Sequence, residues 1–475
     1  MSTRLDFEFQ SGTAAQARRP ADDTGPMRML LLGDFGGHAQ RVPLAARRPL
    51  RVDIDNFDAV MRRIAPRLNL QVCGAAVGLE LASLAEFHPD RLGQNVEALR
   101  VLHEMRGRLQ NPARPAPAAA GEDPSAVWRR LLGRPPETPA APPADPMQAW
   151  IHGLVAPHIV PATPVDQLSL DRVERSLGEP LRALLHEPAF QALEVAWRGV
   201  QWLVARLELN EDLQLHLLDV TREELLADVA AAQGDLSRAG LGQWLCGPGT
   251  ETPEGPRWSL LTGLFSVGPG ADDLALLAGL GAIAARAGGP FVAAAAPALF
   301  GCGSVTDLPE PLRWQPLATE AAQHWAALRR SAAAPWIGLV APRLLMRLPY
   351  GKATDPTEGF GFEEQAATPE HETLLWGPGS LAVALLLGQA FTDSGWDLTP
   401  GQVQDVDDLP AYAFSLDGEA QLQPCAEAWC GERAGQALLE RGVMALLSHR
   451  QRPAVRLLRV QSIAEPPRPL AGPWG

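Results

Sequence analysis

Hydrophobic residues in the first 110 positions form strand-like runs and helical stripes. Residues 27–32, MRMLLL, are an apolar run interrupted only by Arg28; the run predicts a strand that leads into the glycine-rich turn GDFGG, and residues 50–54 predict a second strand. Apolar spacing then predicts an amphipathic helix over residues 57–68, a hairpin within 68–81 and a longer helix over 89–109. The pattern predicts a small α/β unit.

Strand-like and helical patterns alternate in the second part of the chain, from residue 166 onward. Such alternation favours a largely parallel sheet with helices on its faces, because parallel strands need crossover connections. The predicted strands are residues 213–220, 258–265 and 290–296, and the predicted helices are 168–207 (broken at Glu187-Pro188), 222–232 and 272–287. This part predicts a larger α/β domain.

Residues 111–165 separate the two parts and carry 13 prolines. Neither a helix nor a sheet ladder tolerates that density of proline, so the segment predicts an extended linker. Two short helices, DPSAVWRRLLG and DPMQAWIHGLV, are predicted inside it, because each begins with an Asp suited to capping a helix. The expected organisation is a domain over 1–110, a linker over 111–165 and a domain over 166–475.

Composition and charge narrow the class of protein. Hydrophobic residues make up 46% and charged residues 20% of the chain, which is typical of packed globular domains. The net charge is −14, and residues 1–110 hold 15 Arg against 13 Asp and Glu, so the remainder is acidic. Nucleic acid is therefore not an expected partner. We expect neither membrane insertion nor a signal peptide, and hence a cytoplasmic protein whose five scattered cysteines are reduced.

No motif assigns catalysis, a cofactor or a metal. The turn LLLGDFGG lacks both phosphate-loop spacings, so we interpret it as structural and not as a nucleotide site. Cys425, Cys430 and His449 have loose spacing for zinc and lack a second cysteine pair, which favours ordinary thiols. An α/β enzyme with an unrecognised pocket remains an alternative that rests on the fold class alone.

Several strings in the first part resemble the small subunit of the contractile sheath of type VI secretion systems, the TssB or VipA family. The strings are LLLGDFGGHAQRVPLAARRPLRVDIDNFDAVMRRIAPRLNL and FHPDRLGQNVEALRVLHEMRGRL, within residues 4 to about 135. The second part resembles the large sheath subunit, the TssC or VipB family. The matching strings, in family order, include LLHEPAFQALEVAWRGVQWLV, GGPFVAAAAPALFG, APWIGLVAPRLLMRLPYG, FGFEE, LLWG, DDLPAYAF and RGVMALL.

The resemblance implies a structural component of a contractile sheath, with the two subunits fused in one chain, and not an enzyme. The partners implied are other sheath subunits, an inner tube protein, a baseplate and a AAA+ disassembly ATPase. The alternative is a non-polymerising accessory or capping protein of the same machine. The large-subunit pattern stops near Ser462, and the segment that follows it in the family supplies strands to neighbours. We therefore expect short or irregular assemblies from the chain alone, with residues 4–10 as a strand donor.

The matching motifs supply candidate interaction residues. We expect Trp197, Arg198, Phe190 and Leu193 to be buried, because aromatic residues at helical spacing usually face a core. Arg343, Arg347 and Tyr350 are expected to form structural bridges, with the Arg343 guanidinium gathering carboxylates such as Glu363 and Glu364. The two parts are expected to dock against each other. The full set of candidates is Asp34, Phe35, Asp55, Asn56, Phe57, Phe190, Leu193, Trp197, Arg198, Arg343, Arg347, Tyr350, Glu363 and Glu364.

Overall fold

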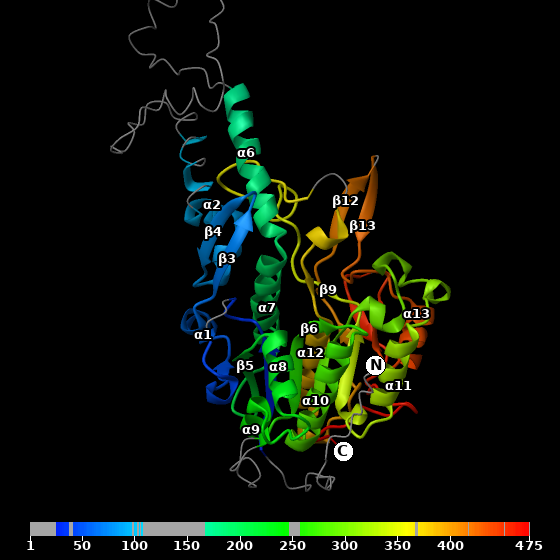
Figure 1. Cartoon of the computed structure of the whole chain (residues 1–475). Helices are drawn as coiled ribbons and strands as arrows, with labels where there is room; N and C mark the ends of the chain where they lie inside the picture. Colours follow the sequence, from blue (N-terminus) through cyan, green and yellow to red (C-terminus); the bar gives the residue numbers. More distant parts are fainter. Residues whose placement is uncertain are drawn as a thin grey trace, which may run out of the picture.

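A computed structural model of the chain describes most of both parts predicted from the sequence (Figure 1). The described residues are 25–37, 41–96, 99–101, 104, 106–107, 167–246, 257–365, 369–416, 418–450 and 452–474. The predicted linker with its two short helices, and the predicted strand donor at residues 4–10, lie outside them.

A nine-stranded sheet forms the centre of the molecule, in the order β11-β15-β14-β8-β7-β6-β1-β5-β2. The six consecutive strands from β14 to β5 run parallel, whereas β2, β15 and β11 are antiparallel to their neighbours. The nine strands are β1 (Met27–Gly33), β2 (Leu50–Val52), β5 (Leu213–Asp219), β6 (Leu260–Val267), β7 (Phe291–Ala295), β8 (Ile337–Ala341), β11 (Asp405–Val406), β14 (Met444–Ser448) and β15 (Val455–Leu457). The predicted α/β class and the largely parallel sheet are confirmed.

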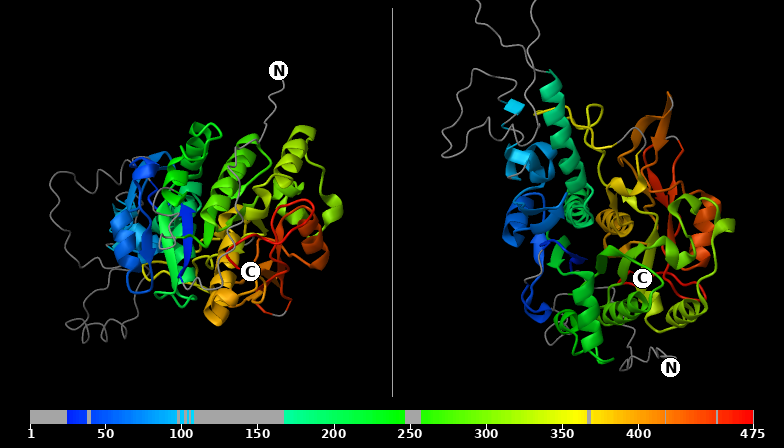
Figure 2. Two further views of the ribbon diagram at one scale, coloured as in Figure 1. Left: turned by 90° about the horizontal axis from the view of Figure 1, so that it is seen from below. Right: turned by 45° about the horizontal axis from the view of Figure 1, so that its top comes forward.

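Helices cover both faces of this sheet (Figure 2). One core contains side chains of α1, α2, α6, α7 and α12, and the other contains side chains of α8, α9, α10, α11 and α13. The helices are α1 (Phe57–Ile64), α2 (Pro89–Asn95), α6 (Gln167–Leu185), α7 (Pro188–Val204), α8 (Arg222–Ala231), α9 (Gly240–Cys246), α10 (Ala271–Ala287), α11 (Thr319–Arg329), α12 (Ser380–Ser394) and α13 (Glu432–Glu440). Residues of β1 alternate between the two cores, as they must in a strand covered on both sides.

Strand β1 joins the two parts of the chain. It lies between β5 and β6, and it pairs with β5 from Met27↔Leu213 to Gly33↔Asp219. Strand β2, also from the amino-terminal part, adds to the outer side of β5. The predicted docking of the two parts is thus confirmed, and it takes the form of one shared sheet.

Three two-stranded sheets complete the strands: β3 (Arg67–Val72) with β4 (Ala75–Glu80), β9 (Leu344–Leu345) with β10 (Trp376–Gly377), and β12 (Tyr412–Leu416) with β13 (Glu419–Gln423). The predicted hairpin is the β3–β4 pair. Its two-residue turn, Cys73-Gly74, has positive φ at both positions (49° and 79°), the geometry that matches the twist of a hairpin.

The helix predicted over residues 89–109 is interrupted, so that prediction is wrong in one respect. Helix α2 ends at Asn95, and Val96 adopts an extended conformation before helical residues resume at 99. The Val96 carbonyl then accepts the Arg100 N–H at 2.8 Å, which begins the next helical stretch. The break occupies so few residues that the apolar spacing continues across it.

No helix among the described residues is long and apolar enough to cross a membrane.

One partly buried histidine of β5 predicts a pH dependence. The ring of His216 packs edge-on against Trp258 at 5.1 Å, and its Nδ1 has no hydrogen-bond partner among the described residues. Burial, with the nearby charges of Arg28 and Arg51, lowers the pKa of His216 from 6.5 to about 4. The folded protein therefore binds this proton less readily than the unfolded chain does.

We expect His216 to cost stability as the pH falls from 6.5 to about 4. In that window the unfolded chain takes up the proton and the folded state does not. The free energy of unfolding therefore decreases as the pH is lowered. The loss is on the order of 3 kcal/mol at most. Urea titrations of wild type and His216→Gln at several pH values measure it. The two stability curves should diverge below pH 6.5, and parallel curves would contradict the assignment.

Candidate functional site

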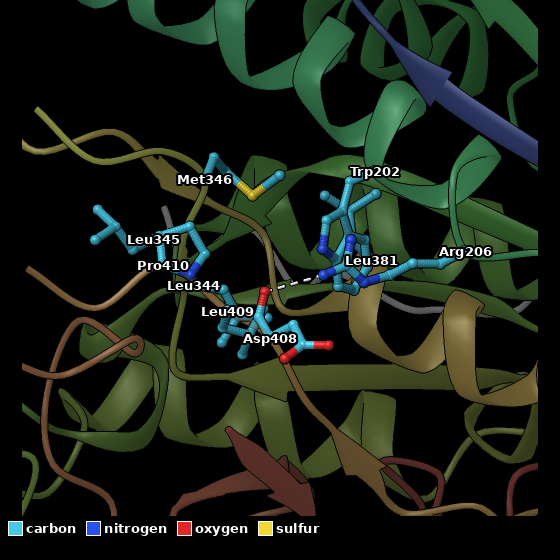
Figure 3. A pocket seen from close by; sticks show the side chains of 9 residues that line it. All are labelled: Trp202, Arg206, Leu344, Leu345, Met346, Leu381, Asp408, Leu409 and Pro410. Atoms are coloured by element: carbon cyan, nitrogen blue, oxygen red, sulfur yellow. Dashed lines mark hydrogen bonds between the residues drawn. The ribbon is translucent and has the colours of Figure 1, made fainter. Parts of the chain in front are cut away.

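A cavity of about 180 Å³ opens beside the carboxyl-terminal end of α7 (Figure 3). Small-molecule and cofactor pockets usually span roughly 300–1,000 Å³, so this one suits a single side chain. The ionisable groups among its described lining residues are Arg206 and Asp408, and the other lining residues are Trp202 and aliphatic or proline side chains. This lining does not assemble an acid–base pair with a nucleophile, and the organising polar groups of the molecule lie elsewhere.

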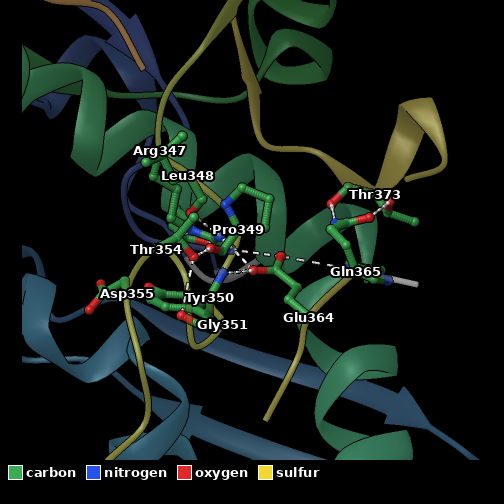
Figure 4. A network of polar contacts seen from close by, with 12 residues as sticks. Arg347, Leu348, Pro349, Tyr350, Gly351, Thr354, Asp355, Glu364, Gln365 and Thr373 are labelled. Carbon is green, nitrogen blue, oxygen red and sulfur yellow. Dashed lines mark hydrogen bonds and ion pairs between the residues drawn. The ribbon is translucent and has the colours of Figure 1, made fainter. Parts of the chain in front are cut away.

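Arg347 lies at the centre of a buried ion-pair network (Figure 4). Its Nε donates to Glu194 Oε1 at 2.7 Å, and its Nη1 donates to Glu364 Oε2 at 2.7 Å. Its Nη2 also reaches both carboxylates, at 3.3 and 3.1 Å. The side chain of Arg347 is 8% exposed, and those of Glu194 and Glu364 are 0% and 1% exposed. Both carboxylates are desolvated, and this guanidinium is the counter-charge that they share.

A second arginine and a tyrosine complete the network. Arg198 lies one turn of α7 after Glu194, and its Nε donates to Glu194 Oε1 at 2.7 Å. The Nη2 of Arg198 donates to the Tyr350 hydroxyl at 2.9 Å. The guanidinium of Arg347 lies 4.1 Å from the centre of the Tyr350 ring. The Tyr350 N–H donates to Glu364 at 2.7 Å. Two positive charges therefore balance two negative charges.

The pKa values in this network follow from burial and charge together. Burial alone would raise the pKa of Glu364, but the charge of Arg347 and hydrogen bonds from Arg347 and the Tyr350 N–H lower it to about 2. Burial, with the charge of Glu194, raises the pKa of Tyr350 to about 12. Burial would lower the pKa of Arg347, but the two carboxylates raise it. At neutral pH Glu364 and Arg347 are therefore charged and Tyr350 is neutral, which suits a structural bridge.

The amino-terminal part contacts this network through the start of α2. The His88 ring packs edge-on against Tyr350 at 4.9 Å. The Asp90 carboxylate accepts the backbone N–H groups of Glu358 and Gly359, at 2.9 and 3.2 Å. Helix α2 therefore holds the loop that carries Tyr350 and leads to Glu364.

A second polar joint forms where β1 and β5 end. The Asp219 carboxylate accepts the N–H groups of Phe35 and Gly36, both at 2.9 Å. It thus occupies the position that an anion takes in a phosphate-binding loop. Arg41, with a side chain only 6% exposed, donates to Asp219 at 3.0 Å and also pairs with Asp34. Burial raises the pKa of Asp34, and the Arg41 charge opposes that shift.

Aromatic side chains fill the space between these joints. Trp197 is fully buried, donates from its indole N–H to the Phe35 carbonyl at 3.0 Å, and packs edge-on against Phe35 and Phe57. Phe190 packs against Phe87 of the amino-terminal part at 5.4 Å. The predicted burial of Trp197, Phe190 and Leu193 is confirmed, whereas Arg198 is only partly buried, with its side chain 20% exposed. These contacts bring α7 of one part against the turns of the other.

The structure places the remaining predicted residues differently. Asp55 is exposed, and Asn56 accepts the Asp53 N–H within the turn before α1, so neither joins the buried network. The predicted pairing of Arg343 with Glu363 and Glu364 is wrong. Arg343 instead donates to the buried Glu427 at 2.7 Å, because Ala426 bridges to Leu344 and brings Glu427 beside Arg343.

Glu363 is exposed and lies in the loop that carries Tyr350 and leads to Glu364. Its carboxylate accepts the Lys352 N–H at 3.0 Å, and its carbonyl accepts from Arg182 at 3.0 Å. Glu194, the partner of Arg347, and Glu427, the partner of Arg343, were not among the residues predicted from the sequence. The sequence did contain a signal for Glu194. A glutamate inside the apolar run QALEVAW is expected to be buried, and a buried carboxylate needs a positively charged partner.

The described residues provide neither a metal-binding cluster nor, at Cys425 and Cys430, a reactive thiol. The described residues contain no cluster of three or more His, Cys, Asp or Glu that could hold a metal. Burial raises the pKa of Cys425 to about 11 and that of Cys430 to about 12, so both thiols are protonated at neutral pH.

Replacing Trp197 with Ala is expected to cost roughly 3 to 5 kcal/mol of stability and to yield insoluble protein, because the side chain is fully buried between the two parts. Trp197→Phe keeps most of the apolar volume and loses the hydrogen bond to Phe35, so it should cost less. Solubility and thermal melting of the two variants measure the difference. A soluble, folded Trp197→Ala protein that fails only in assembly would show that Trp197 serves a partner instead of the core.

Two protein-family models match the chain, one in each of its two parts. A family model described as VipB, EvpB/VC_A0108, tail sheath N-terminal domain, matches residues 168–464, more than half of the chain. The chain therefore belongs to this sheath family. A second family model, described as Type VI secretion system, VipA, VC_A0107 or Hcp2, matches residues 21–118. The resemblance to a fusion of the two sheath families is confirmed.

A curated relative agrees with this assignment. The chain is 29% identical over 300 residues to the type VI secretion system sheath protein TssC1 of Pseudomonas aeruginosa PAO1. The match covers 62% of this chain and 60% of the relative. The chain therefore spans about 60% of the length of the relative that it matches.

Proposed function

We propose that the chain is a structural component of a type VI secretion contractile sheath. One polypeptide supplies a small-subunit-like part (1–110) and a large-subunit-like part (166–475), joined by the proline-rich segment 111–165. The observation that carries the proposal is the position of β1 between β5 and β6. The segments that match the two sheath families share one sheet and thus act as one building block.

The contact between the two parts, made by the shared sheet and the Arg347 network, suits a subunit that transmits force. A sheath contracts when its subunits exchange one packing for another, and each subunit must stay intact while its contacts change. The shared sheet and the Arg347 network resist separation of the two parts, because opening them would expose strand edges and buried charges. The protein acts mechanically in this account and not as an enzyme.

The expected surroundings follow from this role. The chain works in the cytoplasm, packs against other sheath subunits, surrounds an inner tube protein and attaches to a baseplate. A AAA+ ATPase takes the contracted form apart. TssC1 is named as a sheath protein, which supports the contact with other sheath subunits.

Electron microscopy of the purified chain, alone and mixed with separately produced sheath subunits, tests the proposal. We expect short or irregular assemblies from the chain alone and co-assembly along the length of tubes in the mixture, detected with a gold-labelled tag. Label confined to tube ends would favour the capping alternative. Absence of the chain from tubes under both conditions would contradict a sheath role.

A further inference from the structure

The cavity beside α7 has an apolar interior and a charged mouth (Figure 3). Trp202, Met346, Leu381 and Leu409 contribute apolar walls. The guanidinium of Arg206 lies 5.1 Å from the centre of the Trp202 ring. A cavity of about 180 Å³ with this lining suits one aliphatic side chain that has an acidic neighbour.

Arg206 retains hydrogen-bonding capacity at this mouth. Its Nη2 donates to the Asp408 carbonyl at 2.9 Å, and it forms no other hydrogen bond or ion pair with the described residues. Asp408 adopts a left-handed conformation, with φ 54°, which is uncommon outside glycine. This conformation belongs to the loop that holds the Asp408 carbonyl beside Arg206. Most of the five N–H donors of the guanidinium thus remain available to a carboxylate.

The turn between β2 and α1 presents a matching group. Ile54 is 74% exposed and sits between Asp53 and Asp55. One oxygen of Asp53 accepts the N–H groups of Asp55 and Asn56, at 3.1 and 3.0 Å, so the turn is held in one shape. The exposed carboxylate of Asp55 forms no hydrogen bond or ion pair with the described part of the chain. The turn therefore exposes the Ile54 side chain and the Asp55 carboxylate next to each other on the surface.

Charge distinguishes Ile54 from the other exposed apolar side chains of the described residues. Leu312, which is 81% exposed, is flanked by Pro311 and Arg313, and Leu422 is flanked by two glutamines. Neither has a carboxylate directly beside it for Arg206. Ile54 differs from both because Asp55 beside it brings a free carboxylate that can pair with Arg206, while the Asp408 carboxylate adds one negative charge to the same lining.

We propose that Ile54 and Asp55 of one copy dock into the Trp202–Arg206 cavity of a second copy. Helix α1, which follows the Ile54 turn, and strand β9, which lines the cavity, lie on opposite sides of α7 (Figure 1). A chain with the projecting group on one side and the cavity on the other makes a head-to-tail contact that leaves both ends open. Such a contact extends an assembly, and the inference rests on the proposed sheath function for its setting.

A charge-swap series tests the contact in the full-length chain. Ile54→Ser and Asp55→Arg should each lower the sedimenting, assembled fraction about tenfold, because they remove apolar burial or place like charges together. Arg206→Asp should do the same, and the double variant Asp55→Arg with Arg206→Asp should restore assembly. Leu312→Ser is the matched control and should have no effect. Thermal melting of each variant separates loss of assembly from loss of folding.

A photo-reactive residue at position 54 identifies the contacted surface directly. We expect cross-links between two chains, mapped by mass spectrometry to residues 344–346 or 409. Assembly with unchanged yield in the Ile54 and Asp55 variants, or cross-links to other residues, overturns this proposal and leaves the sheath function standing. Cross-linked pairs without any tubes would support the contact and contradict the sheath function. Absence of both cross-links and assembly overturns both.

Discussion

A chain that begins at residue 166 is expected to be insoluble. Its sheet would lack β1, which pairs with β5 along its whole length and with β6 on the other side. The loss would expose two strand edges in the middle of a sheet, along with the apolar side chains that Leu30, Leu31 and Leu32 cover. Expression in Escherichia coli followed by fractionation of the lysate measures the effect. We expect essentially complete loss from the soluble fraction.

Supplying residues 1–110 as a separate chain should restore solubility. The ion pair between Arg106 and Glu174, 2.9 Å from nitrogen to oxygen, shows that residues on either side of the connecting segment lie close together. The covalent connection is therefore not needed to span a distance and only raises the effective concentration of one part for the other. A soluble, cooperatively melting fragment 166–475 on its own would contradict the importance of the shared sheet.

Replacing Arg347 with Met is expected to destabilise the fold by about 3 to 5 kcal/mol. The change leaves the carboxylates of Glu194 and Glu364, both fully buried, without their shared counter-charge. Chemical denaturation of the purified variant measures the loss.

Arg452→Met provides the matched control. Arg452 pairs with Asp405 and Asp407 at the surface, where its side chain is 45% exposed, and such pairs contribute about 1 kcal/mol or less. Equal effects from the two substitutions would mean that the Arg347 network does not hold the joint together.

Much of the sheet could be predicted from the sequence because its strands are covered on both faces. Runs such as MRMLLL at β1 are apolar at every position except Arg28, and this pattern indicates a buried strand without any knowledge of its neighbours. The same pattern does not say which strands lie alongside. The strand, turn, strand and helix of the first part predicted a small α/β unit, yet β1 and β2 extend the sheet of the second part.

The partners of the buried arginines were harder to predict. Glu364 lies 17 residues from Arg347 in the chain and was included, whereas Glu194 lies 153 residues away on a helix whose periodicity signals only a core. Arg343 was assigned the wrong carboxylates because its true partner, Glu427, comes close only through the bridge between Leu344 and Ala426. Pairings of this kind depend on chain crossings that local patterns do not encode.

Cryo-electron microscopy of tubes assembled with this chain tests the central claim most directly. The account predicts a helical sheath in which each repeating unit contains both parts, with β1 between β5 and β6. Tubes whose density lacks either part, or preparations in which the chain remains apart from every tube, would contradict it.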